Sequence, residues 1–157
     1  MTGVQTCALP ISLIGLRREV TFEGQAAIEL EMIAQSDERG RYDFAIEGDG
    51  PWQVDFRPLV VEILRDPAAA PVKAAKFHNT LAEATAEVCL RIARETALRR
   101  VCLSGGTFQN MRLLGTTAAA LRRNELEVYL HARVPPNDGG IALGQAAIAA
   151  AAGNINF

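Results

Sequence analysis

Two short loops carry the residues best suited to chemistry in this chain. The first is "SGGTFQN", from Ser104 to Asn110, and the second is "VPPNDGG", from Val134 to Gly140. In the first loop, Gly105 and Gly106 let backbone N–H groups approach a phosphate or nucleotide with no Cβ in the way. A tight strand-to-helix turn explains the same glycines equally well, because a glycine pair is a weak motif by itself.

The second loop places one carboxylate, Asp138, just before Gly139, Gly140 and an alanine-rich run. An Asp at such a position commonly caps a helix, because its side chain accepts a hydrogen bond from a backbone N–H of the first turn. The same carboxylate can instead bind a hard metal ion or orient a water. The spacing alone favours the cap, and the two roles compete for the same oxygens.

Neither histidine completes a recognisable motif. His78 lies beside the apolar stripe of a predicted helix, where a packed or surface histidine is expected, and His131 ends a predicted strand. The sequence holds no H-x-x-x-H or H-E-x-x-H pattern, so no complete metal site can be assembled from it. Two histidines this far apart in sequence also support no Ser-His-Asp arrangement.

The elements that must position these loops follow from hydrophobic periodicity and turn residues. We expect two short strands around the turn Gly48-Asp49-Gly50. We expect helices over residues 24–35, 57–66, 72–98 and 108–124, a further helix after Gly139, and buried strands at "RVCL" and "LEVYL". These two strands and the helix between them form a β-α-β unit, which joins parallel strands by a right-handed crossover. The carboxyl ends of parallel strands meet at one edge of a sheet, so both loops should face the same edge.

The periodicity also predicts which side chains are buried. Helix 72–98 should bury a stripe of Phe77, Leu81, Ala84, Val88 and Ile92, with Glu87 and Arg91 paired on its surface. We further expect the following residues to pack inside the protein: Met111, Leu114, Ala118 and Leu121 of the next helix, the aromatic residues Trp52 and Tyr129, and the thiols of Cys89 and Cys102.

Composition excludes several classes of protein. The 157 residues are 49% hydrophobic and 22% charged, which suits one globular domain with a real core. A net charge of −2 gives no basic surface for nucleic acid or for an anionic membrane. No apolar run reaches the roughly 18 residues of a membrane helix. Three widely spaced cysteines argue against disulfides or a zinc ribbon and favour a cytoplasmic location.

The first eleven residues, "MTGVQTCALPI", fit nothing that follows them. They lack the positive region and the cleavage site of a signal peptide, and they match the translation of a common sequencing adapter. We therefore expect residues 1–11 to be non-native and residues 12–157 to be the domain.

The chain resembles a known family through several stretches in order. "KFHNTLAEA", "RRVCLSGGTFQNMRLL" and "RVPPNDGGIALGQA" look like the C-terminal end of the hydrogenase-maturation carbamoyltransferases, the HypF family. "LIGLRREVTFEGQAAIELE" and "YDFAIEGDGPWQVDFRPLV" are similar to it in character. The resemblance covers residues 12–150.

This resemblance implies a fold and an activity. Proteins of the family are multidomain, with acylphosphatase-like, zinc-finger and YrdC-like parts, and the YrdC-like part makes carbamoyl-adenylate from carbamoyl phosphate and ATP. The last domain has the actin/Hsp70-type (ASKHA) α/β fold, is similar to TsaD proteins, and passes the carbamoyl group to a C-terminal cysteine of the partner HypE. That group becomes a cyanide ligand of the [NiFe] hydrogenase centre. The chain looks like the second half of this last domain, a parallel β-α-β core with flanking helices.

The resemblance also implies roles for the two loops. Ser104, Gly105, Gly106, Asn110 and Gly139 match positions that line the nucleotide cleft for ATP or carbamoyl-adenylate. Asp138 matches the aspartate that completes a divalent-metal site, and the histidine pair that supplies the other ligands belongs to the first lobe, which this chain lacks. We therefore expect the chain alone to be inactive and to expose apolar surface that favours self-association.

Two other interpretations remain at this stage. An O-carbamoyltransferase or a TsaD-like tRNA-modification protein shares the same fold. A non-catalytic interaction domain could use that fold as a scaffold. Neighbouring hydrogenase-maturation genes would decide the first question, and ATP binding by a chain with its first lobe restored would decide the second.

Overall fold

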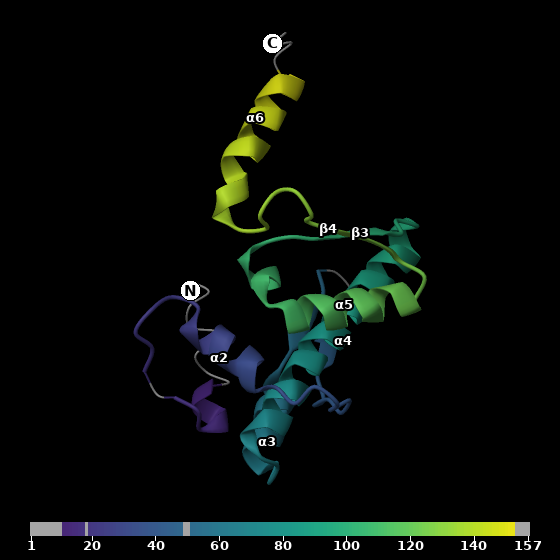
Figure 1. The fold of residues 1–157 in the computed structure, drawn as a ribbon. Coiled ribbons are helices and arrows are strands. Elements are labelled where there is room, and N and C mark those ends of the chain that lie inside the picture. The colour runs from purple at the N-terminus through teal and green to yellow at the C-terminus, as the bar shows by residue number, and fades with distance from the viewer. Residues whose placement is uncertain (1–10, 18, 49–50, 153–157) are drawn as a thin grey trace.

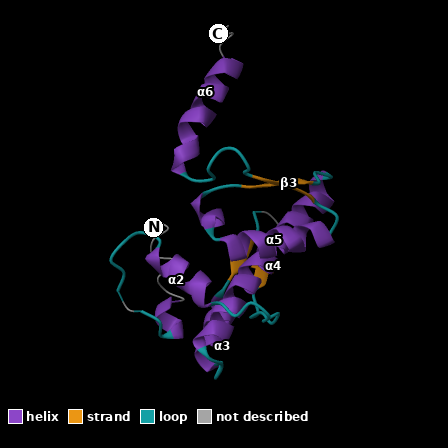
Figure 2. Ribbon diagram, viewed as in Figure 1, coloured by secondary structure: helices purple, strands orange, loops and turns teal. Residues whose placement is uncertain are grey.

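The computed structural model describes residues 11–17, 19–48 and 51–152. Figure 1 shows their arrangement, and Figure 2 distinguishes helices from strands. After a helical turn at residues 11–14, the elements are α2 (Gln25–Ile33), β1 (Ala45–Glu47), β2 (Gln53–Asp55), α3 (Arg57–Arg65), α4 (Ala70–Thr96), β3 (Arg100–Leu103), the 3₁₀ turn η1 (Gly106–Gln109), α5 (Met111–Arg123), β4 (Glu127–Leu130), the 3₁₀ turn η2 (Asp138–Gly140) and α6 (Ile141–Ala152). The expected helices and strands are confirmed, although residues 49–50 of the predicted turn and residues 1–10 lie outside the described parts.

The predicted β-α-β unit is present. Strands β3 and β4 pair in parallel, with Val101 opposite Val128 and Leu103 opposite Leu130, and α5 is the crossover between them. Helices α4 and α5 lie side by side beneath the strands (Figure 1). One apolar cluster packs between the two helices and the strands, and its buried members are Ala86, Ala93, Leu103, Ala118, Ala120, Leu121 and Leu126. This core fixes the strand ends from which both loops leave.

The N-terminal half packs on the other part of α4. Strands β1 and β2 form an antiparallel hairpin, and α3 begins directly after it with Pro58 in its first turn, where a missing N–H costs nothing. Two small clusters hold α2 and α3 in place: one contains Ile11, Ala26, Leu30 and Ala74, and the other contains Tyr42, Leu59 and Ile63. Ile11 is buried there, so the packed region includes the last residue of the segment predicted to be non-native.

Of the predicted buried stripe of α4, only Ala84 is confirmed as buried, with Thr80 one turn before it. Most of the burial lies on another face of the helix, which is lined mainly by small residues: Ala74, Ala75, Ala82, Ala86 and Ala93, together with His78 and Asn79. Phe77, Leu81 and Val88 are only partly buried, and Ile92 is exposed. Small side chains let α5 and the loops approach α4 closely, so packing distance and not hydrophobicity selects the buried face. The predicted Glu87–Arg91 pair is confirmed, with 3.0 Å between Oε1 and Nε.

Several other residues predicted to be buried are exposed. Met111 is 67% exposed, and Tyr129 and Cys102 also lie open on the surface. All three sit near the sheet face opposite α4 and α5 or at the edge where the loops leave. The core beneath the sheet is complete without them, because Leu103, Leu121 and Leu126 fill it.

Helix α6 stands apart from the rest of the described chain (Figure 1). Its residues are all exposed, including Ile141, Leu143 and Ile148. An apolar helix without a covering surface leaves hydrophobic area in water that a partner surface would bury. Within the described residues, no helix is long and apolar enough to cross a membrane.

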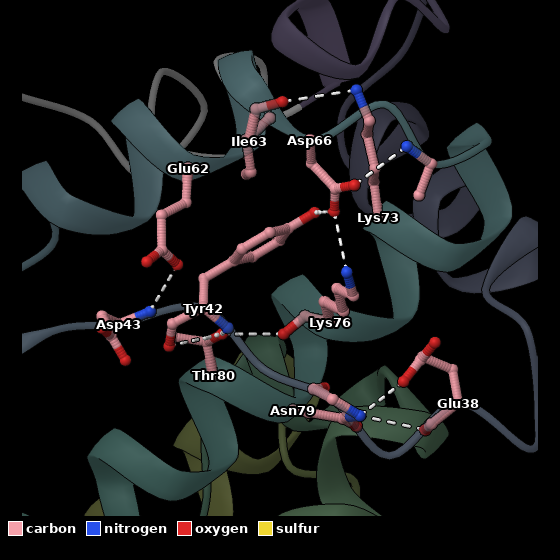
Figure 3. A network of polar contacts seen from close by, with 12 residues as sticks. Glu38, Tyr42, Asp43, Glu62, Ile63, Asp66, Lys73, Lys76, Asn79 and Thr80 are labelled. Carbon is pink, nitrogen blue, oxygen red and sulfur yellow. Dashed lines mark hydrogen bonds and ion pairs between the residues drawn. The ribbon is translucent and has the colours of Figure 1, made fainter.

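A polar network ties the loop before β1, which carries Tyr42, to α4 and to Asp66 at the end of α3 (Figure 3). The Tyr42 hydroxyl donates to Asp66 Oδ2 at 2.8 Å, and Lys76 Nζ lies 2.9 Å from the same oxygen. Burial raises the pKa of Asp66, but the hydrogen bonds from Lys76, from the Ala68 N–H and from Tyr42 outweigh it and bring that pKa down to about 2. Burial, followed by the bond to Asp66, raises the pKa of Tyr42, so its hydroxyl remains a donor.

We predict that Asp66→Asn lowers the free energy of unfolding by about 2 kcal/mol at pH 7, because hydrogen bonds to a charged group are lost. The folded-state pKa of Asp66 lies below its unfolded value. The stability that its charged carboxylate adds is therefore complete above about pH 4 and is lost as the pH falls through about 2. Urea unfolding at pH 7 and between pH 4 and 2 measures both effects.

Asp43→Asn is the matched control, because the Asp43 side chain is 73% exposed and, among the described residues, its carboxylate pairs only with Arg41. Its unfolding free energy should change by less than about 0.5 kcal/mol, as is typical of a surface ion pair. Equal effects of the two substitutions would show that the Asp66 network does not stabilise the fold.

Candidate functional site

The structure brings the two predicted loops together at one edge of the parallel strand pair. The ring Nε2 of His131, just after β4, lies 2.8 Å from the Ser104 hydroxyl, just after β3. One residue further on, the Gly105 N–H donates to the carbonyl of Pro136 at 2.9 Å. The expectation that both loops face the same edge is therefore confirmed, and side-chain and backbone bonds hold them in contact.

The two glycines of the first loop have different local requirements. Gly105 has φ +102°, a conformation that side chains rarely adopt, so the turn itself requires glycine there. Gly106 has no positive φ, and a Cβ added to it would meet no atom within 4 Å. The backbone conformation of the turn therefore explains why residue 105 is glycine. It does not explain why residue 106 is glycine, and the space beside Gly106 is open. Among the described residues, the N–H groups of Gly106 and Thr107 have no hydrogen-bond partner.

A pocket of about 290 Å³ opens beside this loop. Its lining is largely apolar and comes from the end of β3, the turn η1, the start of α5 and the second loop: Leu103, Phe108, Gln109, Met111, Leu114, His131 and Pro136. Pockets of this character, with a few polar groups at the mouth, are typical of small-molecule sites at the carboxyl edge of parallel strands. The exposure of Met111 is explained by its position in this wall.

Asn110 lies where the first loop enters α5. Its Oδ1 accepts from the Leu113 N–H at 2.8 Å, so Asn110 is the N-cap of α5. Its amide nitrogen lies 3.0 Å from Nε2 of His78. One N–H of that amide is still available to a ligand, because an Asn side chain has two donors.

In the second loop, Asn137 and not Asp138 is the capping residue. The Asn137 side chain accepts from the Gly139 N–H at 3.1 Å. The exposed Asp138 carboxylate accepts no hydrogen bond from the described residues, so the cap interpretation of Asp138 is wrong. A Cβ on Gly139 or Gly140 would come within 3.2 Å or 2.8 Å of Pro135, so these glycines let the loop fold back on the proline.

The described residues alone do not fit a metal ion. They include no cluster of three or more His, Cys, Asp or Glu side chains that could hold one. Asp138 offers a single carboxylate, and firm binding of a divalent metal needs several preorganised donors. A metal at this edge would need ligands from outside the described chain, so we assign no reaction step to one.

Sequence reasoning missed His131 as part of this edge and His78 as a contact of Asn110. The signal for His131 was available, because it follows β4 as Ser104 follows β3, and parallel pairing in register places the two side by side. The contact of His78 with Asn110 spans 32 residues and depends on the packing of α4 against α5. No local pattern reveals such a contact.

Comparisons with known proteins agree on one family. Residues 11–145 match the family model described as "Carbamoyltransferase, Kae1-like Domain, second subdomain". Carbamoyltransferase HypF of Synechocystis sp. is 39% identical over 137 residues, which are 85% of this chain and 17% of that protein. Carbamoyltransferase HypF of Rhizobium leguminosarum bv. viciae is 38% identical over 139 residues, or 88% of this chain and 18% of that protein.

Solved structures give the same result. The crystal structure of full-length HypF in the phosphate- and nucleotide-bound form superposes with a TM-score of 0.85 and 37% identity over 94% of this chain and 20% of that one. T. kodakarensis HypF, 24% identical, superposes with a TM-score of 0.79 over 92% of this chain and 19% of that one, which supports the fold. The chain thus has an ASKHA-type, Kae1-like fold and spans about a fifth of the length of these relatives.

Proposed function

Because the chain belongs to the HypF carbamoyltransferase family, in the second subdomain of its Kae1-like domain, we propose that it forms the nucleotide-facing half of a carbamoyl-transfer site. Membership of this family sets aside the O-carbamoyltransferase and TsaD-like interpretations. Since the chain corresponds to less than a fifth of the length of the Synechocystis and Rhizobium proteins, the complete activity in this proposal needs a longer protein that supplies the opposite lobe.

One observation carries this proposal: two loops from the ends of parallel strands are bonded to each other and border an apolar pocket. The bonds are those of Ser104 to His131 and of Gly105 to Pro136. A relative 37% identical to this chain was crystallised with phosphate and nucleotide bound, which supports a nucleotide as the ligand class. The open space at Gly106 suits a phosphate, and the apolar pocket suits the base.

The proposed reaction takes carbamoyl-adenylate, made from carbamoyl phosphate and ATP, as the donor. A thiol of a HypE-type hydrogenase-maturation protein attacks the carbamoyl carbon, a carbon–sulfur bond forms, the bond to the adenylate oxygen breaks and AMP leaves. The thiol proton passes to solvent. In this scheme the present chain binds and orients the nucleotide part of the donor, which makes the transfer effectively intramolecular.

Asp138 is the proposed metal ligand of this half. Its carboxylate is exposed, accepts no hydrogen bond from the described residues and lies in the loop bonded to the glycine loop. We propose that it contributes one oxygen to a divalent-metal site whose remaining ligands come from the opposite lobe.

Gly106→Ala tests the nucleotide site. In a protein extended by the preceding lobe, we predict about a tenfold or greater loss of ATP affinity, equivalent to about 1.4 kcal/mol or more, because the added methyl occupies the space proposed for phosphate. The unfolding temperature should not change, since that methyl meets no atom within 4 Å. Titration calorimetry and a thermal melt measure the two quantities.

Gly115→Ala is the matched control, because Gly115 lies in α5 and an added Cβ also meets nothing within 4 Å. It should stabilise the helix by about 0.5–1 kcal/mol and leave ATP affinity unchanged. Unchanged ATP affinity in Gly106→Ala would mean that the glycine pair serves only to form a tight turn. No ATP binding by the extended parent protein would favour a non-catalytic interaction domain.

A further inference from the structure

His78 is a buried polar side chain to which the proposed function gives no role. It lies in the middle of α4 and is 2% exposed. Its Nδ1 lies 2.7 Å from the carbonyl oxygen of Ala74, one turn earlier, and its Nε2 lies 3.0 Å from Nδ2 of Asn110. A carbonyl can only accept, so Nδ1 carries the proton, and Nε2 of the neutral ring is then an acceptor.

The orientation of the Asn110 amide is fixed independently. The Leu113 N–H can only donate, so the group 2.8 Å from it must be the amide oxygen of Asn110. The amide nitrogen therefore faces His78 and donates to Nε2. The bonds form one directional series, in which Leu113 donates to Asn110, Asn110 to His78, and His78 to Ala74. No link can be reversed without placing two donors or two acceptors together.

This series anchors the last residue of the glycine loop to α4. The start of α5 is held a second time from α2, because Glu31 Oε1 accepts from the Arg112 N–H at 3.0 Å. The other end of the loop is bonded to the second loop through Ser104 and Gly105. The loop is thus fixed at both ends, and on the α4 side the fixing residue is His78.

We propose that His78 is a positioning residue that holds the Ser104–Asn110 loop in its ligand-receiving shape by accepting a hydrogen bond from Asn110. Its relevance to nucleotide binding rests on the proposed function. The anchoring itself does not, because it consists of hydrogen bonds between residues of this chain.

The arrangement tolerates only neutral His78. A proton on Nε2 would face an N–H of Asn110, and turning the amide over would face its N–H groups toward that of Leu113. Burial lowers the pKa of His78; among its neighbours, the bond to Ala74 raises it, Arg112 of α5 lowers it, and Glu31 of α2 raises it. Because the folded-state pKa of His78 is lowered, the stability that its neutral ring adds to the fold is complete above about pH 6.5. It is lost as the pH falls toward the folded-state pKa.

The test compares His78→Leu with His78→Gln. Leucine removes the acceptor, whereas the glutamine amide can donate to Ala74 and accept from Asn110. Hydrogen exchange of the Leu113 and Phe108 amides reports loop order, and ATP titration of the protein with its preceding lobe reports binding. We expect about tenfold faster exchange in His78→Leu and restoration in His78→Gln. In the unmodified chain, ¹⁵N spectra should show the Nδ1–H tautomer at pH 8.

Thr85→Val is the control, because Thr85 also donates to a carbonyl one turn earlier on α4 but forms no hydrogen bond with the loop among the described residues. It should leave exchange of Leu113 and Phe108 unchanged. Unchanged loop exchange in His78→Leu, or an Nε2–H tautomer in the unmodified chain, would overturn the positioning role. An ordered loop that fails to bind ATP would instead count against the proposed function, and the exchange data would still decide the role of His78.

Discussion

Asp138→Ala should lower carbamoyl transfer by about 100-fold or more while leaving the fold unchanged. Removing even an outer partner of a metal ligand costs about 10–100-fold in affinity or activity, and a direct ligand should cost at least as much. The fold should be unaffected because the Asp138 carboxylate is exposed and accepts no hydrogen bond from the described residues, while its backbone carbonyl, which accepts from the Ile141 N–H, is kept in alanine. The measurements are transfer of labelled carbamoyl to a HypE-type acceptor, bound metal per protein and a thermal melt, all in the protein with its first lobe.

Asn137→Ala separates this effect from the shape of the loop. Asn137 is the capping residue, so its loss should cost about 1 kcal/mol of stability and reduce transfer far less than Asp138→Ala does. Asp138→Asn keeps the side-chain shape without its charge and should behave like alanine. Retained carbamoyl transfer in Asp138→Ala would contradict the metal-ligand role. Lost transfer with unchanged bound metal would mean that the carboxylate acts in another way.

Leu121→Ala should have the largest effect on stability. The side chain is fully buried where α5 packs against α4 and β3, so we expect a loss of about 3 kcal/mol from lost burial and from the cavity left behind. That is a large part of the roughly 5–15 kcal/mol that stabilises a typical domain. Urea unfolding of the 157-residue chain measures it.

Leu143→Ala makes the same chemical change on α6, where the side chain is 57% exposed. Its unfolding free energy should move by less than about 0.5 kcal/mol, because little apolar area is buried there and alanine favours a helix. If the two substitutions lowered the free energy of unfolding equally, the cluster beneath the sheet would not be the core of the domain.

The sequence predicts the elements well and the buried faces less well. Long periodic runs and turn residues were enough to locate α4, α5 and the parallel strands. The face of α4 was misjudged because its largest apolar residues, such as Phe77 and Ile92, lie at the margin. Alanines occupy the centre, since only small side chains allow a neighbouring helix that close. Hydrophobicity alone does not predict how closely two helices pack.

The candidate site shows the same division. Parallel pairing was enough to place both loops at one edge, and the residues of the loops followed from it. The bond from Asn110 to His78 and the capping by Asn137 depend on atomic positions that only the packed structure supplies. Periodicity assigns a residue to an element, but it does not choose between two adjacent side chains such as Asn137 and Asp138.

Helix α6 has a consequence for the loop that it follows. Isolated helices shorter than about 12–15 residues are marginal in water even when rich in alanine, and α6 has 12 residues with none buried. Its winding and its docking against a covering surface therefore become one coupled event, as for a segment that folds on binding. Asp138 lies directly before the first residue of α6. We therefore expect the position of its carboxylate to become fixed only when another surface covers α6 and orders the helix.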